Sequence, residues 1–176
     1  GILSSYDDDR AYDTQTNGFA GPHEQTKALY REFARRHLPV GIVNAKDKFD
    51  GLDVIVMPSL VIEDRELTQK LETFVADGGL LLVTARSLTR DANNHVQAVT
   101  APASLSALLG ITREEEGRVF EYDDRLILSL DNHETVQASA GYEKLALAGA
   151  ESLANWRIDR DAARAPHQAE GNCGIS

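Results

Sequence analysis

The sequence predicts an α/β fold in which an open, mostly parallel sheet carries helices on both faces and a β-rich part follows it. In the first 85 residues, short apolar runs and segments of helical period alternate in the order β-α-β-β-α-β. The run at 80–84 (LLLVT) is apolar without alternation, which is typical of a parallel strand covered on both sides. After Gly110 the chain changes to short strand-like runs separated by charged turns.

The first elements follow in order along the chain. Residues 2–6 predict a short buried strand, and residues 7–22 predict an acidic loop. Leu29, Phe33 and His37 then recur at i, i+4 and i+8, which predicts an amphipathic helix. Pro39 is expected to end this helix, because the residue before a proline is pushed out of the helical region. The segments 39–43 (PVGIV) and 50–58 (DGLDVIVMP) predict the next two strands.

A second helix is predicted over 64–77, with Leu67, Leu71, Phe74 and Val75 on one face and Gly78-Gly79 as its stop. A short helix over 104–109 ends at Gly110. The β-rich ending comprises the runs 118–124, 125–130, 142–148, 151–158 and 172–176. A length of 176 residues predicts one domain over 1–176. The apolar pair directly after Gly1 suggests a segment of a longer chain whose first strand is entered midway.

The charge balance limits the classes of partner. Eighteen basic and 28 acidic residues give a net charge of -10, which repels a phosphate backbone or an anionic bilayer. We therefore expect no nucleic-acid and no membrane partner, and no apolar run approaches the ~20 residues that span a bilayer. The single cysteine, Cys173, excludes an internal disulfide and fits a reducing compartment, so we expect a cytoplasmic protein.

No catalytic residue is predicted from the nucleophile and carboxylate motifs. A hydrolase elbow needs small residues around its serine, and neither Ser59 (MPSLV) nor Ser87 (TARSL) has them. Cys173 lies in a strand-like run, which favours a buried, unreactive thiol. The acidic runs 7–9 and 114–116 are typical of solvated faces and turns.

No metal site or cofactor is predicted either. The pair His133-Glu134 lacks a second histidine one helical turn later. The loop 13–24 partly matches a calcium-binding loop, with Asp13, Gln15, Asn17, Gly18 and Glu24 at positions 1, 3, 5, 6 and 12. However, position 3 is glutamine, Pro22 interrupts the loop and no helix is expected before it. We interpret the segment as a polar loop leading into a helix N-terminus, and calcium binding is the alternative.

Several segments in a fixed order resemble one known family. They are "NGF", "YREF", "LPVGIV", "LDVIVMPSL", "FVADGGLLLVTAR", "DANNHV" and "LSALLGI". Together they are similar to the middle, or trimerisation, domain of glycoside hydrolase family 42 β-galactosidases. The resemblance implies a flavodoxin-like sheet related to class I glutamine amidotransferases. In those relatives the turn after the "GG" strand carries a cysteine nucleophile, and the corresponding region here is Thr84 to Arg86.

The resemblance also implies a function. The family's hydrolytic carboxylates lie on a preceding barrel domain, so the segment is expected to be non-catalytic and the parent chain to be a retaining β-galactosidase acting on terminal β-galactosides. The expected partners are two further copies, in a homotrimer, and the barrel domain of the same chain.

Loops at the carboxyl ends of parallel strands usually carry function in open sheets. The candidates for contacts there are Asp7, Asp8, Ser59, Arg86, Asn93, Asn94 and His95. Ordinary loop polarity is the other interpretation of these residues. Two alternatives for the whole segment are an amidotransferase-like enzyme that uses Cys173, and a small-molecule or sugar-binding module that uses the old active-site cleft beside residues 87–96.

Overall fold

The structure, a computed structural model, describes residues 1–13, 21–97, 102–118, 125–130, 134–138, 141–159 and 170–174. The chain divides into two compact units, Gly1–Leu108 and Leu109–Ser176, and each is described by itself. No helix in the described ranges is long and apolar enough to cross a bilayer.

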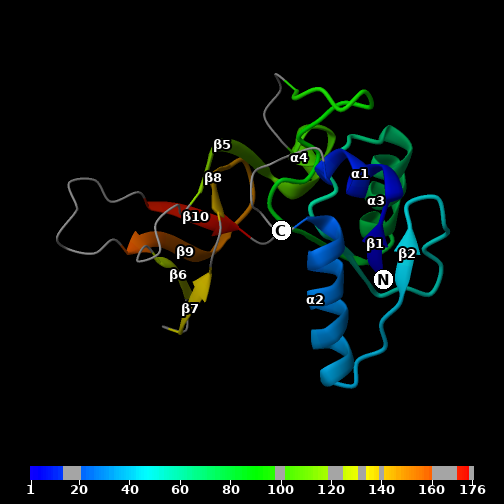
Figure 1. Ribbon diagram of the computed structural model, residues 1–176, viewed down its shortest axis with the longest axis horizontal. Coiled ribbons are helices and arrows are strands. Elements are labelled where there is room, and N and C mark those ends of the chain that lie inside the picture. The colour runs from blue at the N-terminus through cyan, green and yellow to red at the C-terminus, as the bar shows by residue number, and fades with distance from the viewer. Residues whose placement is uncertain are drawn as a thin grey trace. The chain divides into compact units, whose positions relative to one another are not determined.

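The first unit is built on a four-stranded parallel sheet (Figure 1). Its strands are β1 (Ile2–Ser4), β2 (Ile42–Asn44), β3 (Val54–Met57) and β4 (Leu80–Val83), in the order β2-β1-β3-β4. Ile2 pairs with Ile42, and Val54 pairs with Leu80. The central β3 is rich in β-branched residues and buries Ile55, as expected for a strand covered on both faces. The prediction of an open parallel sheet is confirmed.

Two helices cover this sheet. Helix α2 (Pro22–Arg35) packs against β1, and helix α3 (Arg65–Ala76) packs against β4. The chain steps from β1 to β2 in one direction and from β3 to β4 in the other. Because crossovers between parallel strands are right-handed, the two helices cover opposite faces.

Helix α3 agrees with its predicted bounds and has a cap at each end. The Asp64 side chain accepts hydrogen bonds from the backbone N–H groups of Glu66 and Leu67, at 2.9 and 3.2 Å. At the other end Gly78 adopts a left-handed backbone with φ of 96°, and the N–H of Gly79 donates to the carbonyl of Phe74. This is the Schellman arrangement that the glycine pair predicts.

Helix α2 ends earlier than predicted, at Arg35 rather than just before Pro39. Its C-terminus has the same Schellman arrangement, with His37 in the left-handed region at φ 56°. The N–H groups of His37 and Leu38 donate to the carbonyls of Ala34 and Phe33. His37 is therefore an exposed capping residue, and its predicted place on the apolar helix face is wrong.

Residues 6–13 form a helix where the sequence predicted a loop. Helix α1 (Tyr6–Asp13) has three aspartates in its first turn, where the helix dipole favours negative charge. The Ser5 hydroxyl accepts a hydrogen bond from the N–H of Asp8 at 3.3 Å. Ala11 and Tyr12 are buried and pack with Val61. Tertiary packing and capping thus stabilise a segment whose composition alone favours a loop.

The first unit ends within the short helix α4 (Ser106–Leu109), which follows a 3-10 turn, η1 (Ala103–Leu105), and precedes Gly110 at φ 61°. The predicted short helix is thus present. The hydroxyls of Thr68 on α3 and Ser104 on η1 lie 2.9 Å apart. The fully buried large side chains of this unit include Ile2, Leu3, Ile55, Met57, Leu60, Leu71, Leu88 and Leu105.

The second unit is β-rich, as predicted. Strands β6 (Arg125–Leu130), β7 (Thr135–Ala138), β9 (Ser152–Asp159) and β10 (Glu170–Gly174) form an antiparallel sheet in the order β10-β9-β6-β7. Strands β5 (Ile111–Arg118) and β8 (Gly141–Leu147) form a separate pair. Trp156 on β9 stacks on Tyr142 of β8 with ring centroids 4.3 Å apart, and its indole N–H donates to the Glu143 carbonyl at 3.1 Å.

Two strands of this unit differ from the prediction. Strand β5 covers 111–118, whereas the sequence predicted a strand over 118–124, of which 119–124 lie outside the described residues. The acidic run 114–116 therefore belongs to strand β5. Lys144, on the neighbouring strand β8, forms an ion pair with Glu114 at 3.0 Å. Strand β7 was not predicted. Strand β7 is only four residues long and β5 is mostly charged, so neither has the apolar run that identifies a strand in sequence. Pairing with neighbouring strands stabilises them instead.

Candidate functional site at the carboxyl edge of the parallel sheet

A partly buried polar network around Ser59 joins the ends of β3 and β4. Ser59 follows β3, is 2% exposed and has a left-handed backbone with φ of 46°. Its N–H donates to the Thr84 hydroxyl at 2.8 Å, and its own hydroxyl donates to the Ala85 carbonyl at 2.7 Å. Gln25 on α2 donates to the Ser59 hydroxyl at 2.6 Å and accepts from the Thr84 hydroxyl at 2.9 Å.

The hydrogen bonds of this network have the pattern of a structural connection between segments. A nucleophilic serine needs a base that accepts its proton, whereas the Ser59 hydroxyl donates to a backbone carbonyl. In the described part of the chain, the hydrogen bonds of Ser59 and Thr84 involve no histidine, carboxylate or thiol. The turn that follows β4 is therefore joined by hydrogen bonds to the end of β3 and to helix α2.

Asp8 and Arg86 attach helix α1 to the same edge. The Asp8 carboxylate is 5% exposed and accepts a hydrogen bond from the Ile62 N–H at 2.8 Å, just beyond β3. Burial raises the pKa of Asp8 above its ordinary value, while hydrogen bonds from Ile62, Ser5 and Val61 oppose that rise. The Arg86 guanidinium carbon lies 5.7 Å from the ring centroid of Tyr12 on α1. Asp7, by contrast, is exposed.

Asn93, Asn94 and His95 lie on a separate turn organised by Asp91. One Asp91 carboxylate oxygen accepts from the N–H of His95 at 2.8 Å and of Asn93 at 2.9 Å. These bonds, that of His95 first, hold the pKa of Asp91 below its ordinary value. Arg90 donates to the carbonyl of Asn94, whose φ is 64°. The turn leaves Asn93 and His95 exposed.

The structure thus brings together only part of the predicted set. Ser59 belongs to the buried network, Asp8 and Arg86 hold α1, and the three residues of the 93–95 turn bond to Asp91 and Arg90. Sequence reasoning missed Gln25 and Asp91, which organise the network and the turn. Asp91 had a signal, because an aspartate two residues before Asn93 fits a turn in which the side chain bonds the backbone. Gln25 had none, since a glutamine inside a helix is unremarkable.

The predicted calcium loop is described only at its ends. Gln15, Asn17 and Gly18 lie outside the described residues. Asp13 ends α1, so a helix does precede the loop, contrary to the prediction. Glu24 lies in the first turn of α2, where its ion pair with Lys27 at 3.0 Å holds its pKa low. Within the described ranges, no group of three or more His, Cys, Asp or Glu residues could hold a metal ion.

The amidotransferase alternative depends on Cys173. This residue lies on β10, where its backbone pairs with that of Ala154 on β9. Its side chain, like the whole of His133, is outside the described part. Thr84 and Ala85 belong to the first unit and Cys173 to the second.

Comparison with known proteins identifies the family. Residues 1–168 match the family described as the β-galactosidase trimerisation domain. The chain belongs to this family. The match covers nearly the whole length: it contains all of the first compact unit and extends into the second as far as residue 168.

Relatives and solved structures of this trimerisation domain agree with that assignment. The chain is 32% identical over 133 residues to the β-galactosidase BgaB of Geobacillus sp., and 27% identical over 132 residues to the β-galactosidase LacA of Lactobacillus acidophilus. These alignments cover 76% and 68% of this chain and 20% of each relative, so the chain spans about a fifth of their length.

The fold is similar to that of a cold-adapted β-galactosidase from Rahnella sp. R3, with a TM-score of 0.81 at 21% identity over 88% of this chain and 24% of that one. It is also similar to Gan42B, a GH42 β-galactosidase, with a TM-score of 0.79 at 20% identity over 98% of this chain and 27% of that one. At these identities the likeness concerns the fold alone.

Proposed function

We propose that this trimerisation domain is a non-catalytic building block that holds three copies of a longer β-galactosidase chain together. The observation that carries the proposal is the family match over residues 1–168. The network of Gln25, Ser59 and Thr84 supports it, because these side chains bond to one another at the edge of the sheet where an open α/β fold usually binds a ligand.

The parent chain, in this proposal, hydrolyses terminal β-galactosides. It does so with two carboxylates on a barrel domain that precedes the segment, in the retaining arrangement. The relatives are named β-galactosidases and are about five times as long as the aligned part. The proposed partners are two further copies and the barrel of the same chain, and the proposed location is the cytoplasm.

We further propose that both units form one domain with a flavodoxin-like first part. The parallel order β2-β1-β3-β4 corresponds to the 2-1-3-4 order of flavodoxin-like sheets, with α2 and α3 on opposite faces. Among the candidate contact residues, the exposed Asp7, Asn93 and His95 would touch a neighbouring subunit or the barrel. Asp8, Ser59, Arg86 and Asn94 would shape the loops that present them.

Sedimentation equilibrium of the full natural chain tests the assembly role. The expected mass is that of three chains, and turnover of a nitrophenyl β-galactoside should be present in the same material. A monomeric mass at micromolar concentration would refute the trimer. A full chain that releases ammonia from glutamine, with a thiol that iodoacetamide labels rapidly, would favour the amidotransferase alternative instead.

A further inference from the structure

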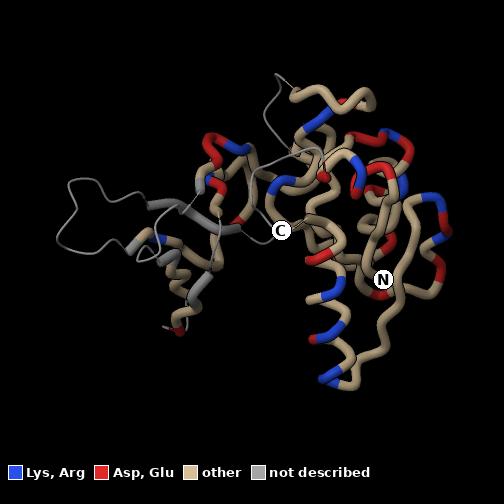
Figure 2. Tube along the Cα trace, in the orientation of Figure 1, with Lys and Arg blue, Asp and Glu red and all other residues tan. Residues whose placement is uncertain are grey.

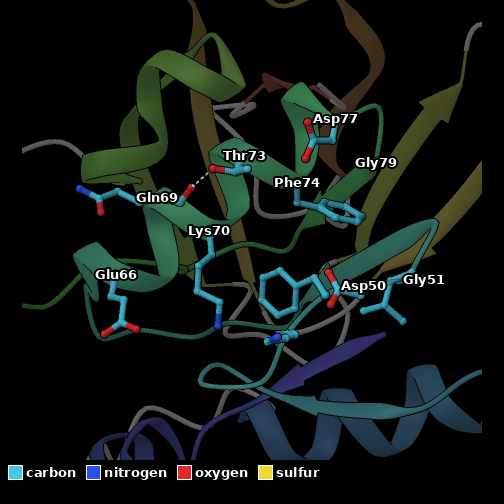
Figure 3. Close-up of a pocket in the computed structure, with 12 residues that line it drawn as sticks. Asp50, Gly51, Glu66, Gln69, Lys70, Thr73, Phe74, Asp77 and Gly79 are labelled. Carbon is cyan, nitrogen blue, oxygen red and sulfur yellow. Dashed lines mark hydrogen bonds between the residues drawn. The ribbon is translucent and has the colours of Figure 1, made fainter.

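The loop after β2 contacts the end of a lysine side chain that comes from α3. The ammonium of Lys70 donates hydrogen bonds to the backbone carbonyls of Ala45 and Asp47, both at 2.6 Å. It also lies 4.7 Å from the ring centroid of Phe49. Figure 3 shows Lys70 extending from α3 toward this loop. Two carbonyl oxygens and an aromatic ring therefore contact one ammonium group, and we call Ala45, Asp47 and Phe49 the ammonium cage.

Each contact in the cage is of a kind that recognises a cationic N–H group. A hydrogen bond with a charged donor is stronger than one between neutral groups. The face of an aromatic ring attracts a cation that lies within about 6 Å of the ring centroid. A lysine ammonium is a compact charge that carries three N–H donors. The chemistry of the cage therefore fits a primary ammonium group.

Bonds within the loop itself determine its shape. The N–H of Asn44 donates to the Asp47 carboxylate at 2.9 Å, and the N–H of Lys46 donates to the side-chain oxygen of Asn44 at 3.0 Å. The N–H of Asp47 donates to the carbonyl of Asn44 at 2.9 Å. These three bonds do not involve Lys70, so we expect the loop to keep its turn when the lysine side chain is removed.

The side-chain charges of the loop do not explain why it holds an ammonium group. Residues 45–50 contain two lysines and two aspartates, so these charges cancel. Figure 2 shows basic and acidic positions alternating along the loop. The hydrogen bonds of the Lys70 ammonium go to main-chain oxygens. The affinity of the cage therefore comes from its backbone carbonyls and its ring.

A groove between α3 and the loop gives a small molecule access to the cage. The groove has a volume of about 540 Å³, and both Phe49 and Lys70 line it (Figure 3). Its other charged lining residues have both signs, with Lys48 beside carboxylates such as Asp50. The groove as a whole thus favours neither cations nor anions, and recognition of an ammonium depends on the cage.

We propose that the ammonium cage is a binding site for primary ammonium groups, and that its ligand in the native chain is Lys70, tethered through α3. Tethering gives the lysine a high effective concentration, so a free amine does not displace it. The contact fastens the loop to α3 and fixes one side of the groove. Removal of the lysine side chain opens the site to an external amine. The inference concerns the first unit alone and does not depend on the proposed trimer.

Removal of the tethered ligand in the full natural chain tests the inference. Lys70→Ala should raise the hydrogen-exchange rate of the loop amides, followed by mass spectrometry, by about tenfold, because the loop loses two charge-assisted hydrogen bonds to α3. Ethylammonium chloride should return the rate toward the wild-type value, because its N–H groups can bond to the same carbonyls. Tetramethylammonium chloride at equal concentration carries the charge without an N–H donor and should have no such effect.

Two further variants make the test specific. Lys70→Met removes the ammonium but keeps an apolar stem in its place, so the loop should exchange faster and ethylammonium should not slow it. Lys48→Ala removes one positive charge from the lining of the same groove and should leave the exchange rate near that of wild type. Wild type itself should not respond to ethylammonium, because Lys70 fills the cage.

Saturation-transfer NMR on the ethyl protons of the amine measures binding directly. The difference between Lys70→Ala and wild type removes the contribution of other sites on the chain. A Lys70→Ala chain whose loop exchanges no faster than wild type would overturn the inference, and so would a faster loop that ethylammonium leaves unchanged. Equal recovery with tetramethylammonium or potassium chloride would overturn the ammonium assignment, because the cage would then respond to charge alone. A Lys70→Ala chain that is unfolded both with and without ethylammonium would also refute it.

Discussion

The hydroxyl oxygens of Ser59 and Thr84 lie 3.3 Å apart and close the gap between the ends of β3 and β4. Both hydroxyls also bond to Gln25 of α2, so three side chains from separate segments form one partly buried network. Open α/β folds usually bind ligands at this edge of the sheet. In this domain the three side chains bond to one another there, which agrees with a structural role.

Thr84→Val should therefore destabilise the first unit. The change keeps the shape of the side chain but removes the acceptor of the Ser59 N–H and the donor to Gln25. Leaving such buried groups unsatisfied costs about 1–3 kcal/mol in the free energy of unfolding. Urea denaturation measures this. Thr73→Val on the exposed side of α3 is the matched control, and equal effects at the two positions would contradict a structural role for the network.

Asp8 should give the protein a pH-dependent stability. Its pKa is raised in the folded state, mainly by burial, so folding favours the protonated carboxyl. The contribution is fully present below the ordinary value of 3.8 and is lost as pH rises through the higher folded value. Asp8→Asn keeps an acceptor for Ile62 without the charge, so the variant should gain stability relative to wild type as pH rises from 4 toward 7.

Urea titrations at several pH values measure that difference. Asp7→Asn, at the exposed neighbouring position, provides the control. A difference between wild type and Asp8→Asn that stays constant with pH would show that burial of Asp8 has no consequence for its ionisation.

The two helix C-termini offer a paired test of backbone strain. Both end in a left-handed residue, which is Gly78 after α3 and His37 after α2. A side chain in that conformation costs about 1 kcal/mol. His37→Gly should therefore raise the free energy of unfolding by up to about 1 kcal/mol, and Gly78→Ala should lower it by about 1 kcal/mol. Thermal unfolding that changes in the same direction for both variants would refute this account.

Asp64→Ala should weaken the start of α3. The carboxylate satisfies the N–H groups of Glu66 and Leu67, and such a cap contributes about 1 kcal/mol. Asp64→Asn, which keeps a side-chain acceptor, should recover most of the loss. Urea midpoints of the two variants give the comparison, and identical losses would indicate that capping is not the source of the stability.

The predictions from sequence held where a local pattern determines the structure. Local sequence is sufficient to predict β3, α3, β4 and the end of α3 at Gly78. The period of apolar residues marks the face to be buried, and glycine adopts the left-handed backbone without any distant partner. Helix α1 and strand β5 failed as predictions for the opposite reason. Helix α1 is stabilised by packing against Val61, and β5 by the ion pair of Glu114 with Lys144. Both partners are remote in sequence.

By itself, then, the sequence determined the parallel α/β core, the β-rich ending, the lack of an elbow serine and the likeness to a trimerisation domain. Only the tertiary structure decided that Gln25 joins Ser59 and Thr84 in one hydrogen-bonded network, and that Asp8 of α1 accepts a hydrogen bond from the backbone of Ile62. The physical reason is that periodicity and capping act within one turn or one strand. Hydrogen bonds between segments and the pairing of surfaces depend on where the crossovers place residues that are dozens of positions apart.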